Sequence, residues 1–217
     1  MAKQKYYAVK KGHKTGIFLT WDECRAATES YADPVFRSFN SKIEANAYLS
    51  GEDLVMENDI LPRVKQGIPV AFTDGSYNIA NDLYGGGAVI FVPPTKSQDE
   101  TNTINNSKPE CLKFIFKGTI AKYSKHKNIA GEIIAGCGVI KWAIDNGYTK
   151  IAIFHDLIGL SEWALGKWKT NCSVSRDYKA YIDTIIDKIE LEFVKVSGHS
   201  NNKYNDIADE LAKQSVI

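Results

Sequence analysis

The order of the strand-like and helical segments from residue 68 onward constrains the fold more than any other feature of this sequence. Three strand-like segments come first, over residues 69–75, 85–92 and 111–121. A helical pattern over residues 130–147 follows. Strands and helices then alternate to the end of the chain, with strands over 150–155 and 191–197. Adjacent strands followed by alternation predict an α/β fold, with a mixed sheet flanked by helices.

Residues 1–50 form a separate pattern with a charge of its own. We expect a small α/β domain of three strands and two helices, and Ser41 followed by Glu44 has the form of a capping box at the second helix. The segment holds eight Lys and Arg against five Asp and Glu, which suits a polyanionic partner. Glycine and proline punctuate residues 51–67, so we expect a linker there and a larger domain over residues 68–217.

Membrane segments and paired cysteines are both missing from the sequence. No apolar run in the 217 residues approaches the roughly 20 needed to cross a bilayer, and the lysine-rich start of the chain does not resemble a signal peptide. We therefore expect a cytoplasmic protein. The cysteines lack the spacing of a zinc site or a disulfide framework and are expected to be reduced thiols: Cys24, Cys111, Cys137 and Cys172.

Four carboxylates stand out because they lie at strand ends and in helices. Asp74 is expected to end the first strand of the larger domain, and Asp156 ends the apolar segment IAIFHD. Glu132 lies in the first turn of a helix, and Asp209 lies in the last helix. Open α/β sheets carry their sites at the carboxyl ends of strands, so these acids could face one crevice. Converging carboxylates repel one another unless cations neutralise them, and oxygen ligands favour Mg²⁺ beside phosphate.

Each of these acids also has an ordinary interpretation. Asp74 precedes a glycine and could be a turn residue, Glu132 could stabilise a helix N-terminus, and Asp209 could be solvated on the last helix. Asp156 is harder to explain in this way, because an apolar strand such as IAIF predicts a buried end. The hypothesis of a metal site therefore depends on the combination of acids.

Four fragments in this order, FTDGSYN, NIAGEIIA, IAIFHD and GHSNNKYNDIADELA, resemble the catalytic domain of type 1 ribonuclease H over about residues 68–215. The resemblance implies a ribonuclease H-like fold, a five-stranded mixed sheet in the order 3-2-1-4-5 flanked by helices. It also implies cleavage of the RNA strand of RNA/DNA hybrids by two Mg²⁺ ions, for which Mn²⁺ could substitute, leaving 5'-phosphate and 3'-hydroxyl ends. The alternative is a catalytically inactive protein that binds such hybrids or double-stranded RNA.

The resemblance implies a role for each residue that matches one of the motifs. The family's catalytic, metal-binding acids match Asp74, Glu132, Asp156 and Asp209. Asp206 competes with Asp209, but an asparagine four residues earlier and ELA directly after it favour Asp209. His199 matches a loop histidine that assists catalysis. Positions that contact nucleic acid match Gly75, Ser76 and Asn128.

Residues 1–50 independently resemble the hybrid-binding domain that precedes many type 1 ribonucleases H, on the fragments YYAVKKGHKTGIFLTWDEC and FRSFNSKIEANAYL. The nucleic-acid-binding residues of that domain match Tyr7, Trp21, Phe36 and Arg37. In so small a domain, three aromatic residues are otherwise expected to pack in the core. As part of a monomer, this domain would hold the catalytic domain near the hybrid and promote repeated cuts.

The sequence departs from the family pattern in three places. Leu157 follows Asp156 where better-known members carry a serine, so contacts there are expected to differ. The stretch after Asp156 is too short for the basic, tryptophan-rich protrusion of some relatives. Four residues could replace part of it or could simply be half-buried on a helix: Trp163, Lys167, Trp168 and Lys169. Ser38 replaces a basic residue that is usual in the hybrid-binding domain, which predicts weaker binding.

Overall fold

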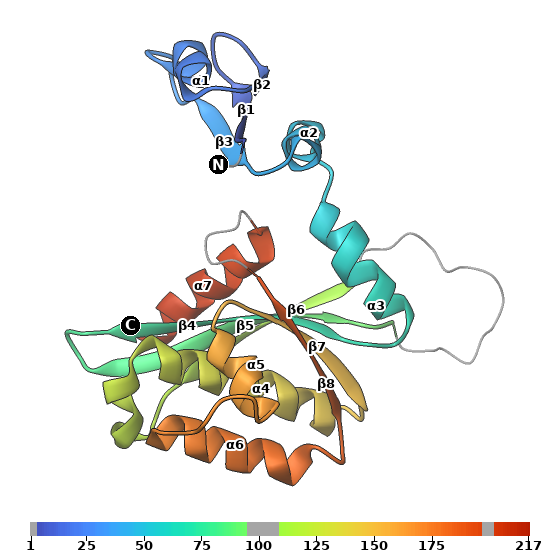
Figure 1. Ribbon diagram of the computed structural model, residues 1–217, viewed down its shortest axis with the longest axis vertical. Coiled ribbons are helices and arrows are strands. Elements are labelled where there is room, and N and C mark those ends of the chain that lie inside the picture. The colour runs from blue at the N-terminus through green and yellow to red at the C-terminus, as the bar shows by residue number, and fades with distance from the viewer. Residues whose placement is uncertain (1–3, 95–108, 197–201) are drawn as a thin grey trace, which may run out of the picture. The chain divides into compact units, whose positions relative to one another are not determined.

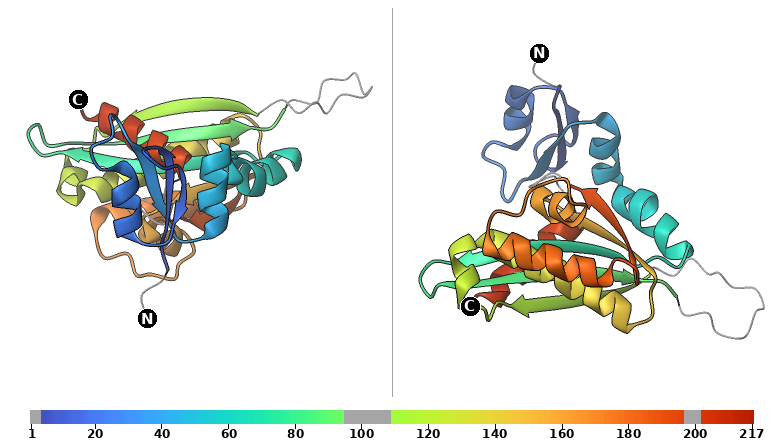
Figure 2. Two further views of the ribbon diagram at one scale, coloured as in Figure 1. Left: turned by 90° about the horizontal axis from the view of Figure 1, so that it is seen from above. Right: turned by 60° about the horizontal axis from the view of Figure 1, so that its bottom comes forward.

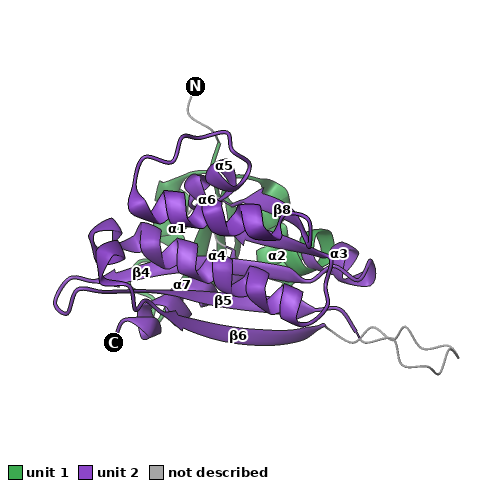
Figure 3. Cartoon of the chain, turned by 90° about the horizontal axis from the view of Figure 1, so that it is seen from below, with its two compact units in different colours: residues 1–59 green, residues 60–217 purple. Residues whose placement is uncertain are grey.

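The computed structural model describes residues 4–94, 109–196 and 202–217, and the chain divides into two compact units, Met1–Asp59 and Ile60–Ile217 (Figures 1 and 3). Each unit has its own sheet. Among the helices in the described ranges, none is long and apolar enough to span a membrane.

The first unit is an antiparallel three-stranded sheet with two helices, as expected. Its strand order is β2-β1-β3, and its elements are β1 (Tyr6–Lys11), β2 (Gly16–Phe18), α1 (Trp21–Thr28), β3 (Val35–Phe39) and α2 (Lys42–Ser50). The predicted capping box is present at α2, because Ser41 Oγ accepts from the Glu44 amide at 3.2 Å and the Glu44 carboxylate accepts from the Ser41 amide at 3.2 Å. Small buried residues such as Ala8 and Ala45 let the helix approach the sheet.

The second unit is built on a five-stranded mixed sheet in the order β6-β5-β4-β7-β8. Its strands are β4 (Val70–Asn78), β5 (Leu83–Val92), β6 (Glu110–Lys117), β7 (Lys150–His155) and β8 (Glu190–Lys195). The first three are mutually antiparallel, and β7 and β8 run parallel to β4. Numbered along this unit, the order is 3-2-1-4-5, which confirms the expected sheet.

Helices cover both faces of this sheet (Figures 1 and 2). The covering helices are α4 (Asn128–Asp145), α5 (Ile158–Ala164), α6 (Ser173–Ile185) and α7 (Lys203–Ser215). The main apolar core lies between the sheet and α4, α5 and α6, around residues such as Ile140, Ile153 and Tyr178. On the α7 face, Phe72 stacks on Phe154 with ring centroids 4.6 Å apart. Two packed layers therefore hold β4 and β7 in place from both sides.

Helical residues occupy much of the segment that was expected to be a linker. A π-helix, η1 (Met56–Ile60), runs into α3 (Leu61–Lys65), and Ile60 and Val64 are buried. Arg63 Nη2 lies 2.7 Å from Glu192 Oε1 on β8, and the guanidinium lies 5.3 Å from the centre of the Phe154 ring. The α3 helix is therefore a packed part of the second unit.

Candidate active site

Asp74 lies within β4 and does not end it, which corrects the sequence-based expectation. The parallel pairing of β4 with β7 stops at the pair Phe72↔Phe154, and beyond it β4 continues beside β5 alone, with Asp74 opposite Gly87. Asp156 directly follows β7. Two residues beyond the last parallel pair, Asp74 and Asp156 therefore come to the same place at the edge where the two strands part.

Glu132 reaches this place because α4 approaches β4 backbone to backbone. A Cβ atom on Gly75 would lie 2.3 Å from the Glu132 nitrogen and 2.5 Å from the Asn128 oxygen. On the helix side, a Cβ atom on Gly131 would lie 2.9 Å from the Gly75 Cα. Glycine at both positions is what allows the start of α4 to lie beside Asp74. Because α4 begins at Asn128, Glu132 lies just after the first turn and not within it, which corrects the sequence-based expectation.

The three carboxylates form a compact group of possible metal ligands. One carboxylate oxygen from each of Asp74, Glu132 and Asp156 lies within 4.8 Å of the others. Glu132 is only 5% exposed, and its buried Oε2 atom has no hydrogen-bond partner among the described residues. Asp74 Oδ1 accepts from the Gly75 amide at 2.7 Å. An unsatisfied buried oxygen in a group of acids fits a bound cation.

The raised pKa values of Glu132 and Asp74 also indicate that these carboxylates would be stabilised by a nearby positive charge. Burial, followed by the hydrogen bond and charge of Asp74 and then by Asp156, raises the pKa of Glu132 well above its usual value. Burial also raises the pKa of Asp74, with the charges of Asp156 and Asp209 adding to the effect. Oxygen-only ligands of this kind suit hard divalent cations such as Mg²⁺ or Mn²⁺. The residues present therefore fit a divalent metal site.

Asp209 lies beside this group and not within it. It projects from α7, which packs on β4 and β5, and its Oδ2 atom accepts from Lys213 Nζ at 2.6 Å in an exposed ion pair one helical turn away. Its charge is nevertheless near enough to contribute to the raised pKa of Asp74. The structure thus brings Asp74, Glu132 and Asp156 close together, whereas the fourth predicted acid, Asp209, forms an ion pair with Lys213.

The residues predicted to contact nucleic acid near the acids are accessible. Gly75 and Ser76 directly follow Asp74 on β4 and are partly exposed, and Asn128 is exposed at the start of α4. The preceding residue, Lys127, has a positive φ of 51°, which turns the chain sharply into the helix. His199 lies outside the described residues.

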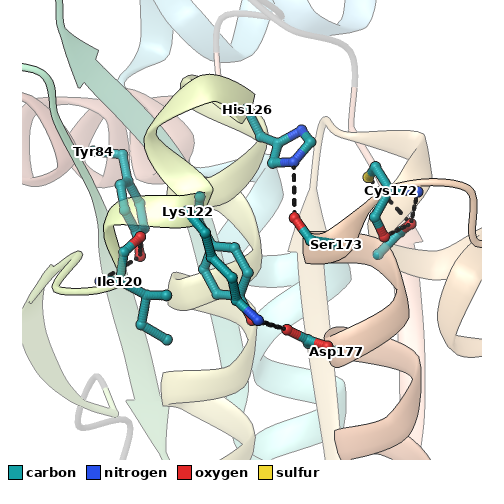
Figure 4. Close-up of polar contacts among 9 residues, drawn as sticks. Tyr84, Ile120, Lys122, His126, Cys172, Ser173 and Asp177 are labelled. Atoms are coloured by element: carbon teal, nitrogen blue, oxygen red, sulfur yellow. Dashed lines mark hydrogen bonds and ion pairs between the residues drawn. The ribbon is translucent and has the colours of Figure 1, made fainter.

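The short segment before α4 is tied to α6 (Figure 4). This 3₁₀-helix, η2 (Ala121–His126), was not expected from the sequence. Lys122 Nζ lies 2.6 Å from Asp177 Oδ2, and His126 Nε2 lies 3.2 Å from Ser173 Oγ (Figure 4). These contacts fix the segment that carries Asn128 into α4.

A second aromatic and basic surface lies at α5 and the loop after it. The rings of Trp163 and Trp168 meet edge to face with centroids 6.2 Å apart. Together with Lys167 and Lys169 they line an open hollow of about 440 Å³. Trp168 is exposed, so this pair is not wholly part of the core.

The aromatic residues singled out in the first unit form one row on its surface. The ring centroids of Tyr7 and Trp21 are 5.8 Å apart, and those of Trp21 and Phe36 are 5.9 Å apart. Trp21 is 47% exposed and Phe36 38%, so neither packs in the core, whereas Tyr7 is partly buried and packs against the small core cluster of Val9, Cys24 and Ala27. Arg37 pairs with Ala8 and Phe36 with Val9, so strand alternation places Arg37 on the opposite face from this row.

Sequence reasoning missed two buried polar residues that directly precede the acids. Thr73 precedes Asp74 and His155 precedes Asp156, and both are fully buried. The available signal was a polar residue at the end of an otherwise apolar strand, as in IAIFH.

Known proteins with similar sequences place this site in a family. The RNase H family model matches residues 68–217, and the Ribonuclease H1 N-terminal domain model matches residues 5–49. Ribonuclease H1 of Homo sapiens is 22% identical over 259 residues, which cover 96% of this chain and 88% of the human protein. Ribonuclease H of Wolbachia pipientis wMel is 26% identical over 156 residues, which cover 68% of this chain and 94% of that protein.

Among solved structures, RNase H1 from the halophilic archaeon Halobacterium salinarum NRC-1 is 15% identical, with a TM-score of 0.48 over 69% of this chain and 97% of that one. The RNase H family model covers more than two thirds of the chain, and the fold has the expected sheet order. The chain therefore belongs to the ribonuclease H family of enzymes, and its first unit is a Ribonuclease H1 N-terminal domain.

Proposed function

We propose that this enzyme hydrolyses the RNA strand of RNA/DNA hybrids with two divalent metal ions, Mg²⁺ or Mn²⁺, and leaves 5'-phosphate and 3'-hydroxyl ends. The observation that carries the proposal is the group of Asp74, Glu132 and Asp156, whose oxygens lie within 4.8 Å of one another in a ribonuclease H domain. Asp209 is proposed to join them as the fourth ligand, which requires that it leave Lys213; the effect of its charge on the pKa of Asp74 supports this proposal.

The contribution of the chain is to hold these carboxylates in advance of the reaction. Two neighbouring strands present Asp74 and Asp156, and the glycine contact brings Glu132 to them from α4. Metal ions bound there would lower the pKa of the attacking water and stabilise the charge on the leaving 3'-oxygen. Because the acids come from three packed elements, the scissile phosphate would meet a site that needs little rearrangement.

Recognition of RNA at the cut is proposed to depend on the residues beside the acids. The exposed amide of Asn128 and the backbone of Gly75 and Ser76 are available to the 2'-hydroxyl, the group that distinguishes RNA from DNA. We assign His199 an assisting role in turnover, on the motif alone.

The first unit is proposed to bind the same hybrid through the row of Tyr7, Trp21 and Phe36. Rings of this kind can pack on the sugars of a duplex, where they act as aromatic anchors of the interface. The lysine excess of residues 1–50 would add contacts to phosphates, so binding should weaken steeply as salt rises. The unit would then keep a monomeric enzyme near its substrate between cuts.

The decisive experiment is cleavage of an end-labelled RNA/DNA hybrid in Mg²⁺, beside RNA/RNA and DNA/DNA duplexes. We expect internal cuts in the RNA of the hybrid alone. Asp156→Asn should abolish them and keep hybrid binding, because the amide keeps the shape and loses the charge. Asp183→Asn, which changes an exposed acid on α6 paired with Lys179, is the matched control and should cut normally. A wild-type protein that binds the hybrid but cuts it in neither Mg²⁺ nor Mn²⁺ would refute the proposal.

A further inference from the structure

His155 occupies an unusual position for a histidine. It is the last residue of β7, is fully buried, and directly precedes Asp156. Its ring meets Phe193 of β8 edge to face, with centroids 5.7 Å apart. Its backbone oxygen accepts from the Val196 amide at 2.9 Å, so the adjacent chain holds the residue in place before Asp156.

The imidazole of His155 reaches over Asp156 to the residue on its other side. Nδ1 lies 2.9 Å from the carbonyl oxygen of Leu157, and because a carbonyl only accepts, Nδ1 carries the proton and donates. The same oxygen accepts from the Leu160 amide at 3.0 Å in the first turn of α5. Leu157 is the N-cap residue of α5 and has no side-chain cap of its own. One hydrogen bond therefore joins the end of β7 to the start of α5 across Asp156.

Burying His155 at this position costs folding free energy that an apolar residue would not cost. Nδ1 is satisfied by the Leu157 carbonyl, but the buried Nε2 atom has no hydrogen-bond partner in the part of the chain that the structure describes. Burying an imidazole with one unsatisfied nitrogen is less favourable than burying a side chain like the neighbouring Ile153. What the histidine provides in return is the bond to Leu157.

We propose that His155 is a positioning residue for the metal site: its hydrogen bond to the Leu157 carbonyl fixes the backbone on both sides of Asp156 and so directs that carboxylate toward Asp74 and Glu132. The inference rests on the proposed metal-dependent function, because the direction of Asp156 matters most when it must act as a ligand. Loss of groups that orient a metal ligand typically reduces metal affinity or activity by about 10-fold to 100-fold.

Thr73 is a natural control for this role. One residue beyond the pair Phe72↔Phe154, Thr73 lies beside His155 on the neighbouring strand, and it precedes Asp74 as His155 precedes Asp156. It is also fully buried, yet its Oγ1 atom has no hydrogen-bond partner among the described residues. Thr73 thus shares the burial and position of His155 but makes no bond across its acid.

The test compares His155→Leu, His155→Asn and Thr73→Val in the full chain. Leucine fills a similar volume without a donor, whereas the amide of asparagine lies where Nδ1 does and can still donate to Leu157. For each variant we would measure the melting temperature, Mn²⁺ affinity by calorimetry without nucleic acid, and kcat and KM on the hybrid in Mg²⁺.

In His155→Leu we expect Mn²⁺ affinity and kcat to fall about 10-fold to 100-fold, with KM for the hybrid within about twofold of wild type. His155→Asn should restore both quantities, and Thr73→Val should match wild type. Equal losses in the leucine and asparagine variants would overturn the proposal, because ring packing and not the donor would then matter. Wild-type values in His155→Leu would overturn it as well.

The experiment also distinguishes failure of the proposed hydrolysis from failure of the proposed role of His155. A wild-type protein that binds Mn²⁺ and does not cut refutes the hydrolysis, while the Mn²⁺ affinities of the variants still decide the role of His155. A wild-type protein that does not bind Mn²⁺ overturns both.

Discussion

Substituting Gly75 by alanine tests whether the contact between α4 and β4 positions the carboxylates of the proposed metal site. The added Cβ atom would lie 2.3 Å from the Glu132 nitrogen, whereas ordinary contacts begin near 3.4 Å. The first turn of α4 must then move by the difference, 3.4 − 2.3 = 1.1 Å, because the atoms that it meets are backbone and cannot rotate away. Glu132 directly follows that turn, and its backbone nitrogen is the atom that the added Cβ meets, so its carboxylate is displaced relative to Asp74.

A displacement of this size should affect catalysis more than folding. Misplacing a catalytic group by about 1 Å can reduce the rate about 100-fold. Overpacking costs about 1–3 kcal/mol in stability, which for a chain of this length lowers the melting temperature by about 2–12 °C. We therefore expect Gly75→Ala to remain folded, to bind Mn²⁺ more weakly in calorimetry, and to lose about 100-fold in kcat on the hybrid.

Gly136→Ala is the matched control on the same helix. The three atoms nearest to its added Cβ all belong to the Leu160 side chain, the closest at 2.7 Å, so a side chain and not the backbone would have to shift. It should keep wild-type Mn²⁺ affinity and kcat, whatever its melting temperature. The reasoning is refuted if Gly75→Ala binds Mn²⁺ and turns over as wild type does, or if Gly136→Ala loses as much.

Three further predictions follow from the charges, the exposed rings and the packed helix. Because the pKa of Glu132 is raised in the folded state, the folded protein holds this proton more tightly than the unfolded chain does, so stability should fall as pH rises above about 4.5. Without divalent cations, the melting temperature of the wild type measured by calorimetry should fall with rising pH more than that of Glu132→Gln. Adding Mg²⁺, which binds only the folded state, should restore the stability of the wild type at high pH. Trp21→Ala or Phe36→Ala should weaken hybrid binding in fluorescence anisotropy by about 1–2 kcal/mol and leave the melting temperature of the second unit unchanged. Removing residues 1–50 should reduce the number of cuts per binding event and leave the second unit stable, whereas removing residues 1–67 should also lower its melting temperature, because buried residues of α3 are lost.

The order of elements could be predicted because its signals are local, whereas the strand order of the sheet was expected only from the resemblance to ribonuclease H. Strand-like and helical periodicity placed the five strands, and the capping box at Ser41 and Glu44 marks a helix start through contacts three residues apart. The position of Asp74 within β4 could not be predicted in this way. The strand runs on to Asn78 because β5 pairs with it throughout, and no local pattern reports the length of that pairing.

The other features could not be predicted because they depend on packing between residues that lie far apart in the sequence. The approach of α4 to β4 depends on Gly75 and Gly131, which lie far apart in sequence and meet only in the fold. The sequence also left open whether Trp21 and Phe36 pack in the core, because an aromatic residue suits either environment. The ordered α3 depends likewise on a distant partner, since Arg63 pairs with Glu192.

The contact between Gly75 and Gly131 also bears on how such an enzyme can change over evolution or in design. Where side chains separate a helix from a sheet, each substitution alters the spacing, and neighbouring residues must adjust. Here the two backbones touch directly, so no side chain at the contact can vary in size. A Cβ atom on Gly86 of β5 would likewise lie 2.6 Å from the Gly131 oxygen, so the spacing between α4 and the sheet is set by glycines on both sides of the contact and would be inherited unchanged as long as these glycines are kept.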